Sequence, residues 1–370
     1  MLSSKQRVLA ALNKEQPDKV PIVETIDWPI QLKLAKMSGL SVGPKNKPFR
    51  EMDLNCRLAE TLELDWVDSY HSTGQVPINE THLRDKYGCI FMASEHGCAV
   101  LVDGPIKDAK DLIGYDMTSI LSSEDLDKER YMVEHAGDKK ACMMWCEDPF
   151  KISWMLRGGL DKLLLDYAIN PSLVHDLARI ATDFNFAVIE MASQIGIDII
   201  GCEGDLASEE NTLISPKHYR EFIKPYQIEL VDFTHQRGMK IFKHSDGNMW
   251  PILEDHMEVG FDGFHPIQPD CMDISEVKTR SAGKLCLIGN IDCRALLCDG
   301  SVEEVEAAVK ETIEIAAPGG GYMLMSSNSI HAGVKPENYI AMVRAGHKYG
   351  VYPHSKKNNL IAINISDQKC

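Results

Sequence analysis

The stretch "MKIFKHSDGNMWPILEDHMEVGFDGFHPIQ", residues 239–268, contains two short apolar runs separated by a longer segment. The first run ends in His244 and Asp246, and the second ends in His265 and Gln268. A short apolar run followed by a longer segment of helical spacing, and then by another such run, is typical of a parallel sheet covered by helices. The stretch therefore predicts one strand–helix–strand unit with polar residues at both strand ends.

The same pattern recurs along the chain. Eight apolar runs end in polar residues, and most are followed by a segment of helical spacing: 20–24, 64–70, 140–148, 197–205, 239–246, 261–268, 284–292 and 321–329. Eight such units predict an α/β fold, a single (β/α)₈ TIM barrel. An open, doubly wound sheet would place a Gly-rich phosphate loop after the first strand, and "IVETIDWPIQ" has none. The barrel is favoured.

Two additions to the barrel are expected. Ser3 or Ser4, followed by "KQRVLAALNKE", predicts a capped N-terminal helical extension. The segment "CIFMASEHGCAVLVDGPI", residues 89–106, predicts a β-hairpin insertion after the second strand, with the turn at "EHG". We expect one domain over residues 1–355 and a polar C-terminal tail over residues 356–370.

Composition excludes several classes of protein. The net charge is -16, with 39 Lys plus Arg against 55 Asp plus Glu, and we find no basic patch, so binding to nucleic acid is not expected. No apolar run is long enough to span a membrane, and the N-terminus lacks a signal peptide. The 11 cysteines are scattered, without a Cys-x-x-Cys pair, which predicts reduced thiols. A cytoplasmic enzyme is the expectation.

In a (β/α)₈ barrel, the active site lies at the carboxyl ends of the strands, where the polar ends of the eight runs converge. These residues are Glu24, Asp68, His71, Glu147, Asp148, Glu203, Asp205, His244, Asp246, His265, Gln268, Asn290, Asp292, Asn328 and His331. Several carboxylates and imidazoles at one mouth suit a divalent cation such as zinc. His244 and Asp246 are two residues apart on an extended segment, so both side chains can reach one ion. Alternatively, Asp246 caps a turn and His244 bonds to the backbone.

Two other positions have competing interpretations. Glu203 follows a wholly apolar run, and a buried carboxylate needs a cation, a histidine or a substrate group as partner. Either a functional role or a structural salt bridge would meet this need. Glu147 and Asp148 precede Pro149, so helix capping and substrate binding are both reasonable.

Several motifs, in this order, resemble the uroporphyrinogen decarboxylase-like superfamily, which includes the corrinoid-dependent methyltransferases. They are "RVLAALNKEQPDKVPI", "LISPKHYREFIKPYQIELVDFTHQRGMKIFKHSDGN", "GFHPIQ", "CLIGNID" and "APGGGYMLMSSNSIHAGVKPENY". The resemblance covers most of the chain and implies a (β/α)₈ barrel. It also implies one of two chemistries, decarboxylation or methyl transfer.

The arginine content separates these chemistries. True uroporphyrinogen decarboxylases carry an arginine-rich stretch after the first strand, whereas this chain has no arginine between Arg7 and Arg50. A substrate with many carboxylates would also meet a mouth lined with carboxylates. The methyltransferase branch looks closer, but its zinc-binding His-x-Cys motif is His244-x-Asp246 here. The position of the family's second cysteine, after the eighth strand, falls near Asn328, so both cysteines are missing from this chain.

The resemblance therefore implies a corrinoid-dependent methyltransferase with metal-assisted activation. We expect zinc or another divalent cation on His244, Asp246 and Glu203, and catalytic roles for Glu203, Asp205 and His265. The expected substrate-binding residues are Asp68, His71, Glu147, Asn290, Asn328 and His331. Cobalamin would come from a partner corrinoid protein, the methyl donor or acceptor would be a small methoxylated or methylated molecule, and a homodimer is in keeping with the family. The alternative is a decarboxylase or lyase acting on a small acid.

Overall fold

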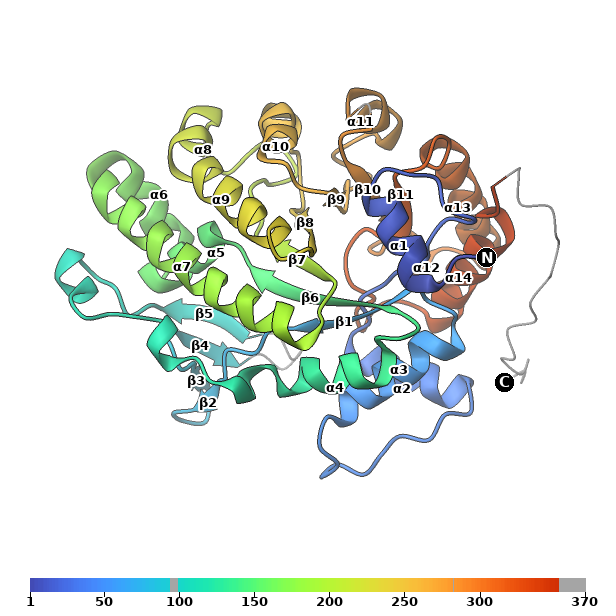
Figure 1. The fold of residues 1–370 in the computed structure, drawn as a ribbon, viewed down its shortest axis with the longest axis horizontal. Helices are drawn as coiled ribbons and strands as arrows, with labels where there is room; N and C mark the ends of the chain where they lie inside the picture. Colours follow the sequence, from blue (N-terminus) through green and yellow to red (C-terminus); the bar gives the residue numbers. More distant parts are fainter. Residues whose placement is uncertain (94–98, 282, 353–370) are drawn as a thin grey trace.

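The computed structural model describes residues 1–93, 99–281 and 283–352, and Figure 1 shows their arrangement. Seven parallel strands pair in chain order into one sheet. They are β1 (Trp66–Tyr70), β6 (Ala141–Glu147), β7 (Ile199–Glu203), β8 (Lys240–His244), β9 (Gly263–His265), β10 (Cys286–Ile291) and β11 (Tyr322–Ser326). All seven coincide with predicted apolar runs, which confirms those predictions.

The predicted first strand, residues 20–24, is not a regular strand, and the prediction is wrong in that detail. The segment makes an isolated parallel bridge from Ile22 to Leu324, and the amide of Asp65 donates to the Ile22 carbonyl at 2.7 Å. Pro21 has no N–H to donate to a ladder, which interrupts regular pairing. The segment nevertheless lies between β11 and β1 and occupies the eighth position of the predicted barrel.

Helices cover the outside of the sheet (Figure 1). They are α2 (Trp28–Met37), α3 (Arg50–Thr61), α4 (Asp127–Ala136), α5 (Pro149–Arg157), α6 (Leu160–Ile169), α7 (Pro171–Ile195), α8 (Pro216–Phe222), α9 (Lys224–His235), α10 (Leu253–Val259), α11 (Ile274–Ser281), α12 (Leu296–Asp299), α13 (Val302–Ala316) and α14 (Pro336–Tyr349). Short 3₁₀ helices span Ala109–Leu112, Thr118–Ile120, Ser123–Leu126 and Trp250–Ile252. No helix in the described part of the chain is long and apolar enough to cross a bilayer.

The predicted N-terminal helix, α1 (Ser4–Leu12), is present and closes one end of the barrel. Ser3 caps it, and the Ser3 and Gln6 side chains each accept a hydrogen bond from the other's backbone N–H. Val8 and Leu12 are fully buried and belong to the same apolar cluster as Trp66, Phe242 and other residues that fill the barrel interior. Because α1 covers the amino-terminal end of the strands, the carboxyl-terminal end is the open mouth.

The insertion after β1 is a four-stranded antiparallel sheet. Its strands are β2 (Val76–Pro77), β3 (His82–Arg84), β4 (Ile90–Ala93) and β5 (Ala99–Asp103), paired in that order. β4 and β5 occupy the segment where the sequence predicts a hairpin, and the predicted turn at 95–97 lies outside the described residues. Figure 1 shows this sheet beside α5 and α7, at the rim of the barrel. The predicted polar tail, 356–370, also falls outside the described residues.

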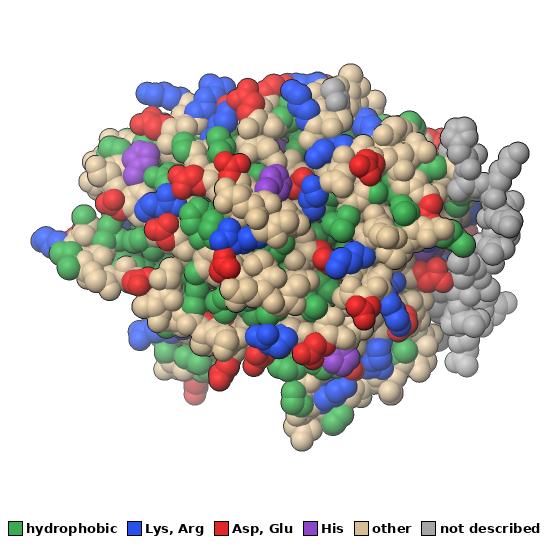
Figure 2. Space-filling view, in the orientation of Figure 1, with side chains coloured by type: hydrophobic (Ala, Val, Ile, Leu, Met, Phe, Trp, Pro, Cys, Tyr) green, Lys and Arg blue, Asp and Glu red, His purple; other side chains and the backbone are tan. Residues whose placement is uncertain are grey.

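Charges of both signs are distributed over the surface. On the face drawn in Figure 2, acidic and basic side chains are interspersed, without a continuous patch of basic residues.

Candidate metal centre

A row of polar residues crosses four neighbouring strands at the mouth. The parallel register pairs Glu147 of β6 with Glu203 of β7, Glu203 with His244 of β8, and His244 with His265 of β9. Residues at the same level of adjacent parallel strands lie close together, because strands are about 4.8 Å apart. The strand ends therefore bring two carboxyl groups and two imidazoles into one row.

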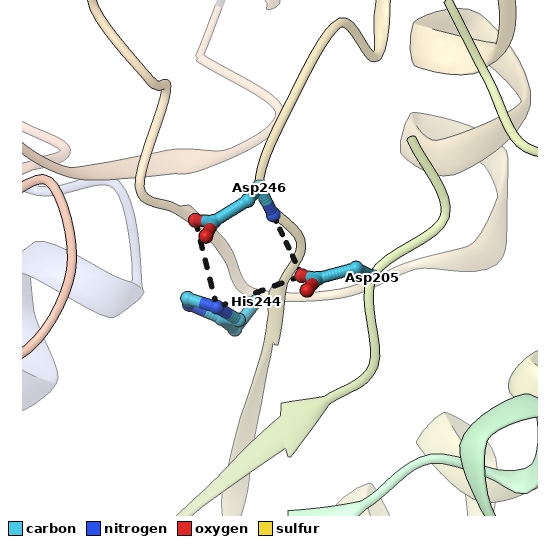
Figure 3. Close-up of side chains that lie close together, drawn as sticks. All are labelled: Asp205, His244 and Asp246. Atoms are coloured by element: carbon cyan, nitrogen blue, oxygen red, sulfur yellow. Dashed lines mark hydrogen bonds and ion pairs between the residues drawn. The ribbon is translucent and has the colours of Figure 1, made fainter. Parts of the chain in front are cut away.

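Asp205, His244 and Asp246 form the centre of this mouth (Figure 3). His244 Nε2 lies 3.8 Å from an Asp205 oxygen and 3.7 Å from an Asp246 oxygen, and Asp246 N–H donates to Asp205 at 2.9 Å. One ligand atom from each residue lies within 4.8 Å of the other two. His244 is buried, whereas the Asp205 side chain is 46% exposed and keeps the group open to solvent. Both separations from His244 Nε2 are too long for hydrogen bonds, but they suit atoms that share one ion.

The His244 tautomer is determined by a chain of hydrogen bonds behind it. His265 Nε2 lies 3.2 Å from the Ser326 carbonyl, which only accepts, so this nitrogen carries a hydrogen. Burial, and then His244, hold the pKa of His265 well below its usual value, so its Nδ1 is an acceptor. His244 Nδ1, at 2.7 Å, must then be the donor to His265. In the neutral form of His244 this direction of hydrogen bonding leaves the lone pair on Nε2, the form that binds a metal.

Asp246 has an oxygen with no hydrogen-bond partner among the described residues. Oδ1 is buried and accepts no hydrogen bond from the described residues, and its neighbour His244 Nε2 lies 3.7 Å away; Oδ2 accepts a 2.8 Å hydrogen bond from the Asn328 amide. Burial raises the pKa of Asp246, and the nearby Asp205 adds to this effect. An unpaired, buried carboxylate oxygen beside a second carboxylate is costly unless a cation neutralises it. These residues therefore fit a divalent cation.

Glu203 faces a lysine. Lys151 Nζ lies 2.8 Å from Glu147 Oε2 and forms a close ion pair with Glu203. Burial, and then the Glu203 charge, raise the pKa of Glu147 well above its usual value. The hydrogen bond from Glu147 and the charge of Lys151 outweigh burial and lower the pKa of Glu203 to about 2. The opposite directions of the two pKa shifts favour a protonated Glu147 beside an ionised Glu203.

Asp148 serves the structure rather than the mouth. Its side chain accepts from the Lys151 amide and caps α5, and it forms a 2.9 Å ion pair with Lys243, with both side chains fully buried. Of the two interpretations of Asp148, the structure selects capping. Lys243 also donates to the Gly204 carbonyl at 2.6 Å.

The other predicted residues are distributed over the mouth and the wall behind it. Asp68 is buried and accepts hydrogen bonds from Thr25, Asn55 and Trp145. Asn290 donates to the Ile267 carbonyl, and Gln268 accepts from the Gly247 amide.

Glu24 accepts from Ser326, and Asp292 caps the segment that leads into α12. His331 lines a cavity together with Asp246 and Asn328, and His71 lines a separate cavity.

Sequence reasoning missed three residues of this site: Tyr70, Trp145 and Lys151. Tyr70 and Trp145 stack at 5.7 Å and line the same cavity as Glu203, His244 and Asp246. Lys151 lies in the first turn of α5, whereas Glu147 is the last residue of β6, so the helical i,i+4 rule does not apply to this pair and gives no signal for it. The pairing of Lys151 with Glu203 depends on the register of β6 and β7.

Comparisons with known proteins agree with this architecture. The family model described as uroporphyrinogen decarboxylase (URO-D) matches residues 84–349. A methylcobamide:CoM methyltransferase, MtbA, from Methanosarcina acetivorans is 23% identical over 333 residues, which are 88% of this chain and 94% of that protein. A uroporphyrinogen decarboxylase from Methylococcus capsulatus is 23% identical over 229 residues, 60% of this chain and 63% of that protein.

The solved structure of a methyltransferase from Methanosarcina mazei has the same fold. It superposes with a TM-score of 0.75 at 22% identity, covering 94% of this chain and 99% of that one. The agreement confirms the barrel fold predicted from the eight apolar runs.

Proposed function

This chain belongs to the uroporphyrinogen decarboxylase (URO-D) family, and within it we propose a methyltransferase that moves a methyl group between a small molecule and a cobalamin-carrying protein. The predicted enzyme class agrees with the names of the MtbA relative and of the M. mazei structure. The MtbA relative spans nearly the same length as this chain. A corrinoid protein is therefore the partner that we propose.

The observation that carries the proposal is the unpaired Asp246 oxygen facing His244 Nε2 and Asp205. We assign Asp205, His244 and Asp246 as ligands of a divalent cation, with zinc as the first candidate. The predicted third ligand, Glu203, is paired with Lys151, and Asp205 lies where that ligand was expected. When bound, such a cation would act as a Lewis acid on a substrate oxygen or nitrogen.

The surrounding residues have separate roles in this scheme. His265 orients His244 and maintains its tautomer, and Asn328 orients Asp246 through their hydrogen bond. Glu147 and Glu203, with Lys151 between them, hold a proton beside the mouth that could be exchanged with a substrate heteroatom. His331 and Asn290 are proposed to contact the substrate.

The ligand set suggests which substrate the site prefers. The resemblance implies that related methyltransferases hold zinc with cysteine thiolates, which make the metal electron-rich. Asp205 and Asp246 supply oxygen ligands instead, so a bound cation would be more electrophilic. This favours polarising an ether or alcohol oxygen over activating a thiol. The carboxylates at the mouth also disfavour a substrate with many carboxylates, such as a porphyrinogen.

The test combines metal analysis with a methyl-transfer assay. Purified protein is expected to hold about one equivalent of divalent metal, and His244→Ala is expected to lose both the metal and methyl transfer. The assay follows the cobalamin spectrum with methylcobalamin or cob(I)alamin and a panel of methoxylated compounds. His235→Ala is a matched control, because His235 pairs with Asp262 at the closed end of the barrel and lies away from the mouth.

Two outcomes would contradict the proposal. One is normal methyl transfer by metal-free protein or by His244→Ala. The other is no spectral change with any methyl donor, combined with release of CO₂ from a small acid. The latter would indicate the decarboxylase alternative.

A further inference from the structure

A second cavity lies beside the mouth, enclosed by the ends of β1 and β6, the inserted segment that follows β1, and helices α5 and α7. Tyr70, Trp145 and Glu203 line both this cavity and the one at the metal centre. The stacked pair of Tyr70 and Trp145 therefore lies between the two cavities. Much of the remaining wall is apolar, including Phe184 of α7 and Met155 of α5.

The lining of this cavity contains buried polar atoms that lack hydrogen-bond partners among the described residues. Both ring nitrogens of His71, the hydroxyl of Tyr87 and Oδ2 of Asp85 are in this state. Tyr87 and Asp85 are each 3% exposed. Buried polar groups in folded proteins are nearly always hydrogen-bonded. Four such atoms on the lining of a single cavity indicate that a molecule with polar groups belongs there.

The size of the cavity restricts that molecule. It offers about 40 Å³ to the centres of water-sized molecules, and one water needs about 10–15 Å³ on this measure. The occupant therefore has only a few non-hydrogen atoms. The ring of Phe184 lies 5.0 Å from Tyr87 and 6.0 Å from His71, so a short carbon chain would contact aromatic surfaces.

The protonation state of His71 distinguishes an alcohol from an alkylammonium ion as the ligand of this cavity. Burial, and then the Lys86 charge, lower the pKa of His71 to about 4, so at neutral pH it has one N–H and one lone pair. An alkylammonium ion could pair with Asp85 Oδ2, but it only donates and would leave the imidazole N–H without an acceptor. The Lys86 charge, which helps to lower the pKa of His71, would also repel a second cation. A hydroxyl group both donates and accepts, and a second oxygen can reach Tyr87 or the other ring nitrogen.

We propose that this cavity binds a small neutral alcohol or diol, with its oxygens hydrogen-bonded to His71 and Tyr87 and its carbon chain against Phe184. The link between this cavity and methyl transfer rests on the proposed function, in which the methyl ether of such an alcohol would be the methyl donor; Tyr70, Trp145 and Glu203 line both this cavity and the one at the metal centre. Binding of the alcohol itself requires neither the metal nor the corrinoid protein.

The experiment measures saturation transfer by NMR from the whole, metal-free protein to 1,2-ethanediol, 2-methoxyethanol and ethylammonium. We expect transfer to both oxygen compounds and little to ethylammonium. His71→Phe should abolish the signal without lowering the melting temperature, because it removes two unpaired polar atoms. Tyr87→Phe, which retains the ring, should weaken binding about fivefold to tenfold, the effect of one hydrogen bond.

His256→Phe is the matched control, because the ring nitrogens of His256, on α10, are also buried and lack hydrogen-bond partners among the described residues, but this ring packs against Phe261 and Phe264, away from the cavity. It should bind both oxygen compounds like the wild type. The proposal is overturned by equal transfer in wild type and His71→Phe, by transfer to no oxygen compound, or by stronger transfer to ethylammonium. Loss of methyl transfer with intact diol binding would count against the proposed function only.

Discussion

His265 lies directly behind His244, with their Nδ1 atoms 2.7 Å apart. The Ser326 carbonyl accepts from the other nitrogen of His265, so the hydrogen-bond direction runs from His244 to His265 to the backbone. His244 Nε2 faces Asp205 and Asp246, and in neutral His244 it carries the lone pair. We therefore propose that His265 positions His244, whereas its strand-end location predicts a catalytic residue.

Replacing His265 should weaken metal binding without removing a ligand. In His265→Ala, the His244 ring loses its acceptor and its preferred tautomer, and zinc affinity should fall about 10-fold to 100-fold. Competition with a chromophoric chelator measures this change. His331→Ala is the control, because His331 bonds to the Cys293 carbonyl instead of to His244. Unchanged zinc affinity in His265→Ala would refute the positioning role.

The resemblance implies a cysteine at position 246. Introducing it should change the absorption spectrum of a bound metal, because a thiolate would replace a carboxylate ligand. In Asp246→Cys, Co²⁺-substituted protein should show an intense near-ultraviolet thiolate-to-cobalt charge-transfer band that the wild type lacks. Ultraviolet–visible spectra recorded during titration with Co²⁺ measure the intensity of this band. Asp148→Cys changes an aspartate that is instead paired with Lys243 and should give no band. Absence of the band in Asp246→Cys would remove Asp246 from the ligand set.

The buried pair of Lys243 and Asp148 should be essential for stability. Both side chains are fully buried, so Lys243→Met leaves a carboxylate without its cation and should lower the free energy of unfolding by about 3–5 kcal/mol. Urea denaturation gives the value. Lys348→Met removes an exposed pair with Glu306, which solvent screens, and should leave the free energy of unfolding nearly unchanged. Similar decreases in the free energy of unfolding of Lys243→Met and Lys348→Met would contradict the expectation that the buried pair matters more for stability than the exposed one.

His256 should make the protein sensitive to acid. Burial, and then Lys243, lower the pKa of His256 from 6.5 to about 3. The folded state therefore keeps it neutral while the unfolded chain takes up a proton, and stability falls as pH decreases from about 6.5 towards 3. When the pH is lowered from 7 to 5, the free energy of unfolding of His256→Phe should decrease by about 2 kcal/mol less than that of the wild type. Urea denaturation at both values measures this, and the difference should vanish between pH 7 and pH 8.

Much of the fold follows from local patterns along the chain. Seven of the eight predicted runs form strands, because apolar β-rich segments between helical segments can be buried only in a parallel sheet. The run at 20–24 fails as a regular strand because Pro21 cannot donate a hydrogen bond. The insertion was expected as a hairpin, but the short strands β2 and β3 carry too little apolar pattern to be recognised.

The sequence by itself determined the barrel, its capped first helix and the set of polar strand ends, including His244 and Asp246. The tertiary structure alone decided how those residues pair: Asp205 with His244 and Asp246, Glu203 with Lys151, and His265 behind His244. Strand register and side-chain direction place these atoms within a few ångströms of one another. Ion pairing and metal binding depend on those distances, and residue order along one strand does not encode them.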